Sequence, residues 1–292
     1  MPGTPKDARD SVRQYYDRVG WRETGEGTPV DSAVNVDRRI VERARPRAGK
    51  SRRFPAGGRR FLDAGCGANP QTALAAGFAE HVCVDFSEVG LAKALAKLGG
   101  SAVGFVADLT VLPAQDGTFD AISCDHVLYH MVPSDQERAF QELYRVLSGG
   151  GQLWIGYTKG PHWLPEKVAR ALRPLGRALA FPLRTLRRGR RLPAGPIACA
   201  QPGTGAAAAG ALFYRPVPVR WWRELLRRQG IQYRLVPDGW LGRRWTGPLP
   251  AFLAVAIVRA LGFLCRRFPR AAFPLAQQYH IIVSKPAGGR RS

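Results

Sequence analysis

The stretch RRFLDAGCGANP, residues 59–70, decides the fold because a hydrophobic run breaks there into a tight glycine turn. Asp63, Gly65 and Gly67 form a D-x-G-x-G pattern between a predicted strand and a helix-compatible segment. Glycines let the backbone turn tightly and approach a ligand, and the amides of a following helix then face that ligand. Asn69 stands near the place of the third glycine of a dinucleotide fingerprint, so the turn suits a smaller or less charged ligand than a pyrophosphate. Taken alone, the motif also fits a purely structural turn.

Working outward from this turn, β-rich runs alternate with helix-like segments and short links. Such alternation predicts a parallel sheet covered on both faces, and the handedness of its crossovers makes it doubly wound. We therefore expect an α/β fold with a Rossmann-like, doubly wound, mostly parallel seven-stranded sheet, and with helical basic or apolar insertions after strands 5 and 6. The expected strands are 59–65, 81–87, 102–110, 119–125, 152–158, 231–239 and 277–286, and the expected helices are 69–80, 88–100, 134–147 and 218–230.

Polar side chains follow four of these strands at the point where each strand ends. Asp85 comes about 20 residues after the turn, where a carboxylate can accept hydrogen bonds from both hydroxyls of a ribose. Asp108 follows the third run and suits an adenine amino group, while Asp125, His126 and His130 follow the fourth. Ligands of open α/β sheets bind outside the carboxyl ends of the strands, so these residues predict one shared site.

Four segments resemble the successive motifs of class I S-adenosylmethionine-dependent methyltransferases: FLDAGCGANP, VCVDFS, ADLTVLPAQDGTFDAI and LYRVLSGGGQLWI. The resemblance covers residues 59–157 and implies S-adenosylmethionine as the cofactor. It assigns the glycine turn to the methionine portion, Asp85 to the ribose, and Asp108 with Leu109 to the adenine. The segment YYDRVGW also resembles a lid helix that covers the cofactor. The implied cofactor-binding residues are Asp63, Gly65, Cys66, Gly67, Asp85, Phe86, Asp108, Leu109, Asp125, Tyr15 and Tyr16.

With this resemblance the chain divides into four parts. We expect an N-terminal lid helix and basic connector at 1–58, a cofactor-binding methyltransferase core at 59–160, a basic helical insertion with the final core helix at 161–230, and the last two strands with an apolar helical insertion at 231–292.

Methyl transfer is an in-line displacement, so the protein chiefly orients the reactants and, for a hydroxyl nucleophile, supplies a base. His126 and His130 are the catalytic candidates because imidazole titrates near neutral pH. The alternative is that both histidines only pack near the cofactor, and methylation of carbon or of an amine needs no base.

The cysteines argue against a metal site and a disulfide framework. Five of them are widely spaced with no C-x-x-C pair, so we expect reduced thiols, mostly in the core, and no metal. The first residues lack the apolar run typical of a secretory signal, so we expect a cytoplasmic protein. Association of this protein with a membrane surface is a further expectation.

The positive charge is concentrated in the second half of the chain. Residues 161–292 hold 24 of the 44 lysines and arginines but three of the 22 acids, within a net charge of +22. This asymmetry favours an anionic partner, although a compositional drift toward arginine is the alternative. Arginines at helical spacing among apolar residues in 166–191 are typical of interfacial helices. The apolar run around 248–265 is either a buried helical hairpin that roofs a pocket or a membrane contact, since Arg259 interrupts it.

Three functions fit these observations. We favour methyl transfer to a small-molecule or lipid-like acceptor, at an anionic membrane surface if the insertions bind one. An RNA methyltransferase that uses the arginine-rich half on phosphates is less favoured, because no recognisable RNA-binding module is present. A non-catalytic protein that binds S-adenosylmethionine and acts as an assembly partner is the third.

Overall fold

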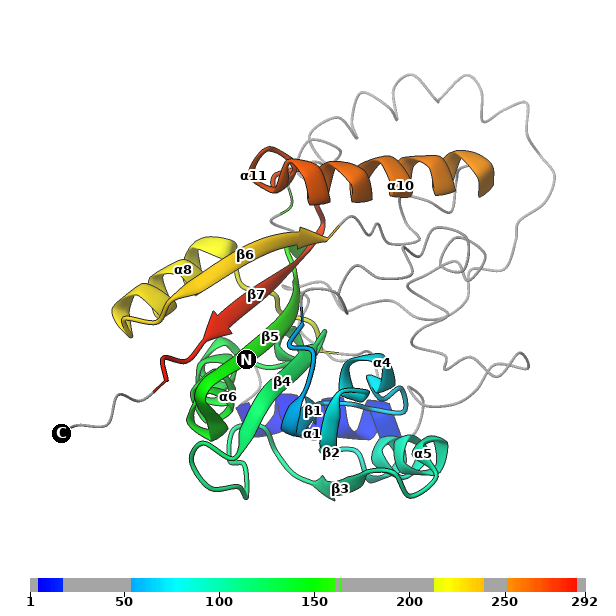
Figure 1. The fold of residues 1–292 in the computed structure, drawn as a ribbon, viewed down its shortest axis with the longest axis vertical. Helices are drawn as coiled ribbons and strands as arrows, with labels where there is room; N and C mark the ends of the chain where they lie inside the picture. Colours follow the sequence, from blue (N-terminus) through cyan, green and yellow to red (C-terminus); the bar gives the residue numbers. More distant parts are fainter. Residues whose placement is uncertain (1–4, 18–53, 161–162, 164–212, 239–250, 288–292) are drawn as a thin grey trace.

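A computed structural model describes residues 5–17, 54–160, 163, 213–238 and 251–287. Its centre is a seven-stranded sheet with the order β3-β2-β1-β4-β5-β7-β6 (Figure 1). The strands are β1 (Gly58–Ala64), β2 (Phe78–Asp85), β3 (Val103–Val106), β4 (Phe119–Asp125), β5 (Leu147–Thr158), β6 (Tyr233–Asp238) and β7 (Gln278–Ser284). The first five strands pair in parallel, and β7 runs antiparallel to both β5 and β6. The predicted mostly parallel, doubly wound sheet is therefore confirmed.

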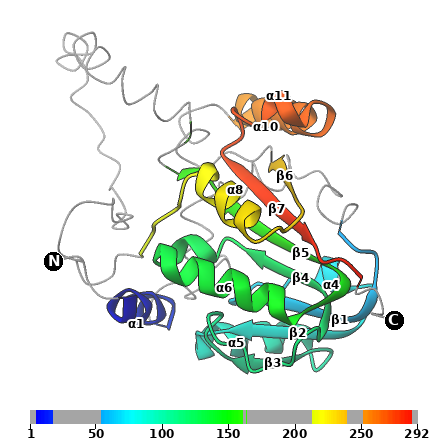
Figure 2. The ribbon, with the colours of Figure 1, turned by 90° about the vertical axis from the view of Figure 1, so that its left-hand side faces the viewer.

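Side chains that alternate along β1 and β2 divide the core between the two faces of the sheet. Leu62, Val82 and Val84 pack in one cluster with residues of α6 (Pro133–Val146) and α8 (Val219–Arg228). Figure 2 shows these two helices over the same face. Phe61 and Cys83 point to the other face, toward α4 (Thr72–Ala75) and α5 (Glu88–Leu98) respectively. Because successive side chains of a strand point to opposite faces, this alternation makes the sheet the middle of three layers.

Helix α5 shows why the chain turns back after β2. Ser87 caps its N-terminus by accepting a hydrogen bond from the Gly90 amide at 3.1 Å, and Gly99 ends it in the left-handed conformation at φ 56°. Both devices satisfy backbone groups that a helix end leaves without partners.

The remaining described helices are α1 (Pro5–Tyr15), α10 (Ala251–Arg267), α11 (Pro269–Ala272) and the short 3-10 turn η2 (Leu128–His130). Helix α1 begins before the expected lid segment, and its Arg9 forms ion pairs with Asp108 in the loop after β3 and with Asp135 of α6. Helix α10 continues through Arg259 as one helix. The helical hairpin, one of the two alternatives expected for the apolar run around 248–265, is therefore wrong. Phe263 and Leu264 are exposed on this helix.

Two other expectations need correction. The helix expected at 69–80 is only the single turn α4, because Gly77 follows it closely and β2 already begins at Phe78. The third strand ends at Val106, so Asp108 lies in the loop beyond it.

The basic connector, the arginine-rich insertion and the run 239–250 lie outside the described residues, as does Cys199. Among the described residues, no helix has the length and apolar character needed to cross a membrane.

Candidate cofactor and acceptor site

The glycine turn and Asp85 form one hydrogen-bonded unit at the carboxyl ends of β1 and β2. The Gly65 amide donates to the Val84 carbonyl at 2.7 Å, which holds the turn against β2. The Gly67 amide donates to Asp85 Oδ2 and the Ser87 amide to Asp85 Oδ1, both at 2.8 Å. The sequence analysis expected both elements at this edge, and the structure brings them into contact.

Gly65 is required at its position for two reasons. Its φ of 71° lies in the left-handed region, which L side chains rarely adopt. A Cβ there would lie 2.4 Å from a methyl carbon of Val127 in the loop after β4. The turn thus allows β1 and the β4 loop to approach each other closely.

The Asp85 carboxylate fits a ribose diol. It is 6 % exposed, and burial raises its pKa to about 6 despite the two backbone donors. Each carboxylate oxygen has two lone pairs, so after accepting one backbone amide each can accept one hydroxyl as well. A hydroxyl pair would also relieve the cost of burying this charge. The residues present therefore fit a cofactor that carries a ribose.

Asp108 is already held by the lid helix. Arg9 Nη1 lies 2.9 Å from Asp108 Oδ2, and the Thr110 amide and hydroxyl donate to Oδ1 at 2.8 Å. Burial would raise the pKa of Asp108, but these donors lower it. Leu109 beside it is buried. The adenine contact predicted for Asp108 stays a prediction, and the structure shows its carboxylate engaged with Arg9 and Thr110.

The lid helix covers the ends of β2 and β4. Tyr15 and Tyr16 are buried, and the ring of Tyr16 lies 6.4 Å from that of Phe86 and 6.0 Å from that of His130. Ser87 Oγ donates to Asp17 Oδ1 at 2.6 Å, so the end of α1 is tied to the start of α5. The expected lid residues therefore lie where a cofactor on Asp85 would be covered.

The chain leaves β4 through a strained turn. His126 has a φ of 61°, and its amide donates to the Gly156 carbonyl of β5 at 3.0 Å. Its side chain is exposed. Asp125 fits beside β5 because residue 156 is glycine, where a Cβ would lie 2.4 Å from Asp125 Oδ1. His280 of β7 faces the same carboxylate at 3.9 Å.

His130 lies among aromatic rings. Its ring is 4.6 Å from Tyr129 and 6.2 Å from Tyr214 between centroids, and its Nδ1 lies 2.7 Å from the Phe213 carbonyl. Burial lowers the pKa of His130 to about 4, so the ring is neutral at pH 7. Because a carbonyl can only accept, Nδ1 carries the proton, and Nε2 is the nitrogen able to accept a hydrogen bond.

Comparison with known proteins agrees with this geometry. Residues 62–155 match a family model described as a methyltransferase domain. Residues 62–155 of this chain are therefore similar to a methyltransferase domain. The match and the strand order agree with the expected class I S-adenosylmethionine-dependent family, for which S-adenosylmethionine is the expected cofactor.

Curated relatives of the methyltransferase domain share only part of their length with this chain. Demethylmenaquinone methyltransferase of Clavibacter sepedonicus is 39% identical over 104 residues, which are 35% of this chain and 42% of that protein. The enzyme of the same name from Streptomyces avermitilis is 38% identical over 79 residues, 25% of this chain and 33% of the relative. The chain thus spans less than half the length of either relative. Among solved structures, the YcgJ protein from Bacillus subtilis matches with a TM-score of 0.48 and 17% identity, over 82% of this chain and 97% of that one.

The structure also shows contacts of residues that the sequence analysis did not single out. Arg9 joins α1 to Asp108, and Tyr129 sits between His126 and His130 in the same turn. Lys159, at the end of β5, is 6 % exposed and donates to the Phe273 carbonyl, with Nζ 4.0 Å from the centre of the Phe273 ring. Burial lowers the pKa of Lys159 to about 8. Most of these contacts join segments that are far apart in sequence, so the sequence gives no indication of them. Tyr129 alone could have been singled out, because it lies between the two candidate histidines.

Proposed function

We propose that this chain transfers a methyl group from S-adenosylmethionine to a small-molecule acceptor of lipid-like character. The observation that carries the proposal is the Asp85 carboxylate, buried at the end of β2 and joined to the Gly67 amide of the glycine turn, within a matched methyltransferase domain. Bound S-adenosylmethionine supplies an electrophilic methyl group on a sulfonium.

The chain's own residues divide the work of binding and orientation. Asp85 accepts the ribose hydroxyls, and the positive-φ glycines at 65 and 67 bring backbone amides close to the methionine portion. Tyr16 and Phe86, whose rings lie 6.4 Å apart, form an apolar wall over the site and exclude water. Holding two reactants in line is the main contribution that such a site makes to the rate.

His130 positions the acceptor rather than taking its proton. A conjugate acid with a pKa of about 4 is a poor match for a hydroxyl near neutral pH. The neutral ring instead offers Nε2 as a hydrogen-bond acceptor, held in place by Nδ1 and the Phe213 carbonyl. His126 is exposed beside this turn and remains a candidate for contact with the acceptor.

Two observations support an apolar acceptor at a membrane surface. The relatives are named for methylation of demethylmenaquinone, a small molecule. Helices α10 and α11 expose apolar side chains beside arginines: Phe263, Leu264, Phe268, Arg266, Arg267 and Arg270. Apolar groups rimmed by arginines are typical of surfaces that rest on anionic lipid.

A labelling experiment tests the proposed function. The protein is incubated with methyl-labelled S-adenosylmethionine and an extract of its source cells, and the extract is separated into organic-soluble, aqueous, protein and nucleic-acid fractions. We expect label in the organic fraction, lost with Asp85→Asn and kept with Asp120→Asn. Asp120 is the matched control because its carboxylate accepts the Arg59 and Arg60 amides at the opposite end of the strands. Label confined to nucleic acid, or no transfer to any fraction, would overturn the proposal.

A further inference from the structure

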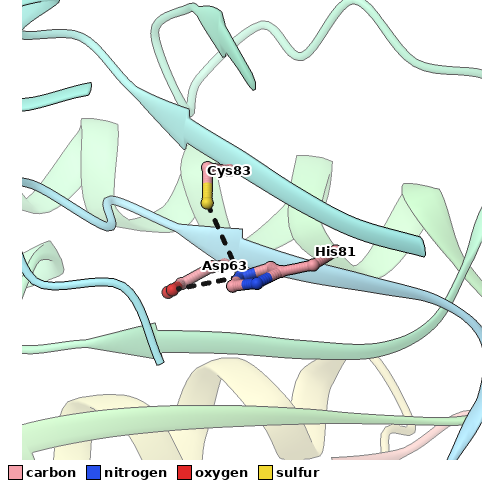
Figure 3. A group of neighbouring side chains, drawn as sticks. All are labelled: Asp63, His81 and Cys83. Atoms are coloured by element: carbon pink, nitrogen blue, oxygen red, sulfur yellow. Dashed lines mark hydrogen bonds and ion pairs between the residues drawn. The ribbon is translucent and has the colours of Figure 1, made fainter. Parts of the chain in front are cut away.

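Three buried side chains with metal-binding atoms meet between β1 and β2, on the face of the sheet toward α4 and α5 (Figure 3). Asp63 of β1 and Cys83 of β2 are partners in the strand register, and His81 precedes Cys83 by two residues on the same face. His81 Nε2 lies 3.6 Å from Asp63 Oδ2 and 3.5 Å from Cys83 Sγ. Their one-atom ligands all lie within 4.8 Å of one another.

These separations match the edges of a tetrahedral zinc site. Zinc lies about 2.0 to 2.1 Å from histidine nitrogen, about 2.3 Å from cysteine sulfur and about 2.0 to 2.2 Å from carboxylate oxygen. At a tetrahedral angle these bonds place neighbouring ligand atoms about 3.3 to 3.6 Å apart. The distances from His81 Nε2 to Asp63 Oδ2 and to Cys83 Sγ fall in or at the edge of that range, so two of the three ligand pairs already have the spacing of a zinc site.

A second thiol stands beside this group. Cys66, in the glycine turn, is buried and packs in the same cluster as Cys83, and its Sγ donates to the Gly67 carbonyl at 3.5 Å. Together the four residues offer one oxygen, one nitrogen and two sulfurs. Sulfur with imidazole selects zinc over magnesium or calcium, which prefer oxygen ligands.

The surroundings support the ligands as well. The Gln71 amide donates to Asp63 Oδ2 at 2.6 Å, and such outer contacts orient a carboxylate for a metal. Leu91 and Ala94 of α5 close the thiols off from solvent, so a bound ion would be fully enclosed. A divalent cation would also offset the charge of Asp63, which is 3 % exposed.

We propose that Asp63, His81 and Cys83 bind one structural Zn²⁺ beneath the glycine turn, and that the Cys66 thiol turns from the Gly67 carbonyl to complete the site. Four protein ligands leave no open coordination position on the ion, so its role is to hold the turn against β2. The site does not depend on which acceptor is methylated. Spacing along the chain gives no sign of it, because the ligands come from two strands and a turn and form no C-x-x-C pair.

The experiment measures metal in the full-length, untagged protein. After purification with zinc in the medium and dialysis against metal-free buffer, we expect one zinc per chain by elemental analysis, and less than a tenth of that with Cys83→Ser or His81→Ala. Cys265→Ser, which removes a buried thiol of α10, is the matched control and should keep its zinc. Zinc that stays with Cys83→Ser would overturn the site.

Binding of cobalt to the wild-type protein tests the site without relying on a variant that folds correctly. Wild-type protein stripped of metal and loaded with Co²⁺ should show the near-ultraviolet band of a thiolate–cobalt bond and visible bands of tetrahedral intensity. The melting temperature should rise on addition of zinc. The proposal fails if the wild-type protein shows neither the thiolate–cobalt band nor one zinc per chain. The group would then be only a buried carboxylate–histidine pair with a neighbouring thiol.

Discussion

At the scale of single residues, His130 makes stability depend on pH. Its pKa is about 4 in the folded protein and about 6.5 when unfolded. Between these values the unfolded chain binds more protons, so folding stability is full above pH 6.5 and is lost as the pH falls toward 4. The difference corresponds to at most about 3 kcal/mol.

We expect His130→Asn to remove this part of the pH dependence. Asparagine can still donate to the Phe213 carbonyl but does not titrate. Urea unfolding at pH 7 and pH 4.5 measures both proteins. If wild type and variant lose the same unfolding free energy between pH 7 and pH 4.5, then His130 takes up its proton equally well in the folded and unfolded states, which contradicts a lowered pKa.

Gly65→Ala should weaken both folding and cofactor binding. The left-handed φ costs about 1 to 2 kcal/mol for alanine, and the clash with Val127 adds about 1 to 3 kcal/mol. Addition of Val127→Ala should remove the free-energy cost of the clash but leave the cost of the left-handed φ. Calorimetric titration with S-adenosylmethionine and thermal melts of both variants separate these two costs. If the double variant is no more stable and binds no more tightly than Gly65→Ala, the whole cost lies in the backbone conformation.

Residues at strand ends were predictable because their position follows from the strand pattern alone. The glycine turn and Asp85 are such residues: both were expected at this edge of the sheet, and the Gly67 amide donates to Asp85 there. Arg9 on Asp108 and Lys159 on Phe273 were not predictable, since each pair joins segments about a hundred residues apart whose proximity only the folded chain creates.

At the scale of elements, helix α1 depends on one arginine. Arg9 Nε lies 3.1 Å from Asp135 Oδ2, and Asp135 is 1 % exposed, so loss of Arg9 would leave a buried carboxylate whose one other ion pair among the described residues is with Arg138 at 3.9 Å. We expect Arg9→Ala to loosen α1 and to lower stability by about 1 to 2 kcal/mol, since half-exposed pairs are screened by solvent. Hydrogen exchange of residues 5–17 measures this directly.

The matched control for α1 is Arg138→Ala. Arg138 is 65 % exposed and stands 3.9 Å from the same carboxylate, so its removal should change exchange in α1 by little. Equal protection of α1 in wild type and Arg9→Ala would mean that the other contacts of this segment, the packing of the tyrosines and the hydrogen bond from Ser87 to Asp17 among them, hold the lid.

Helices were predicted where their apolar spacing is long and their ends carry caps, as in α5 with Ser87 and Gly99. The segment 69–80 was predicted less well, because alanine favours a helix but Gly77 stops it after one turn, where Phe78 joins the sheet. In α10 a charged residue was taken as an interruption, yet Arg259 is exposed on a continuous helix and can reach water without breaking it.

At the scale of the whole molecule, one lysine ties the last strand to the centre of the fold. Lys285, just after β7, donates to the carbonyls of Tyr144, Arg145 and Leu147 where α6 ends. A cation there satisfies carbonyls that the helix end leaves open and meets the negative end of its dipole. The contact adds to the antiparallel pairing that holds β7 beside β5, between that strand and the edge strand β6.

The distribution of apolar and basic side chains over the molecule leads to a prediction about membranes. Phe263 and Leu264 are 57% and 39% exposed on α10, close in sequence to Arg266 and Arg267. Burial of two such side chains in lipid contributes a few kcal/mol in total, at about 25 cal/mol per Å². We therefore expect Phe263→Glu with Leu264→Glu to weaken binding to phosphatidylglycerol vesicles at least tenfold in cosedimentation.

The control for this prediction uses apolar side chains that are at least as exposed but belong to the other end of the sheet. Val103 and Val111 are 62% and 72% exposed near β3, so Val103→Glu with Val111→Glu adds the same charge and should bind vesicles nearly as wild type does. Binding should also fall with salt and with phosphatidylcholine in place of the anionic lipid, because the arginines act through charge. Equal weakening by both double variants would mean that only net charge drives the association, and α10 would then make no specific contact with the membrane.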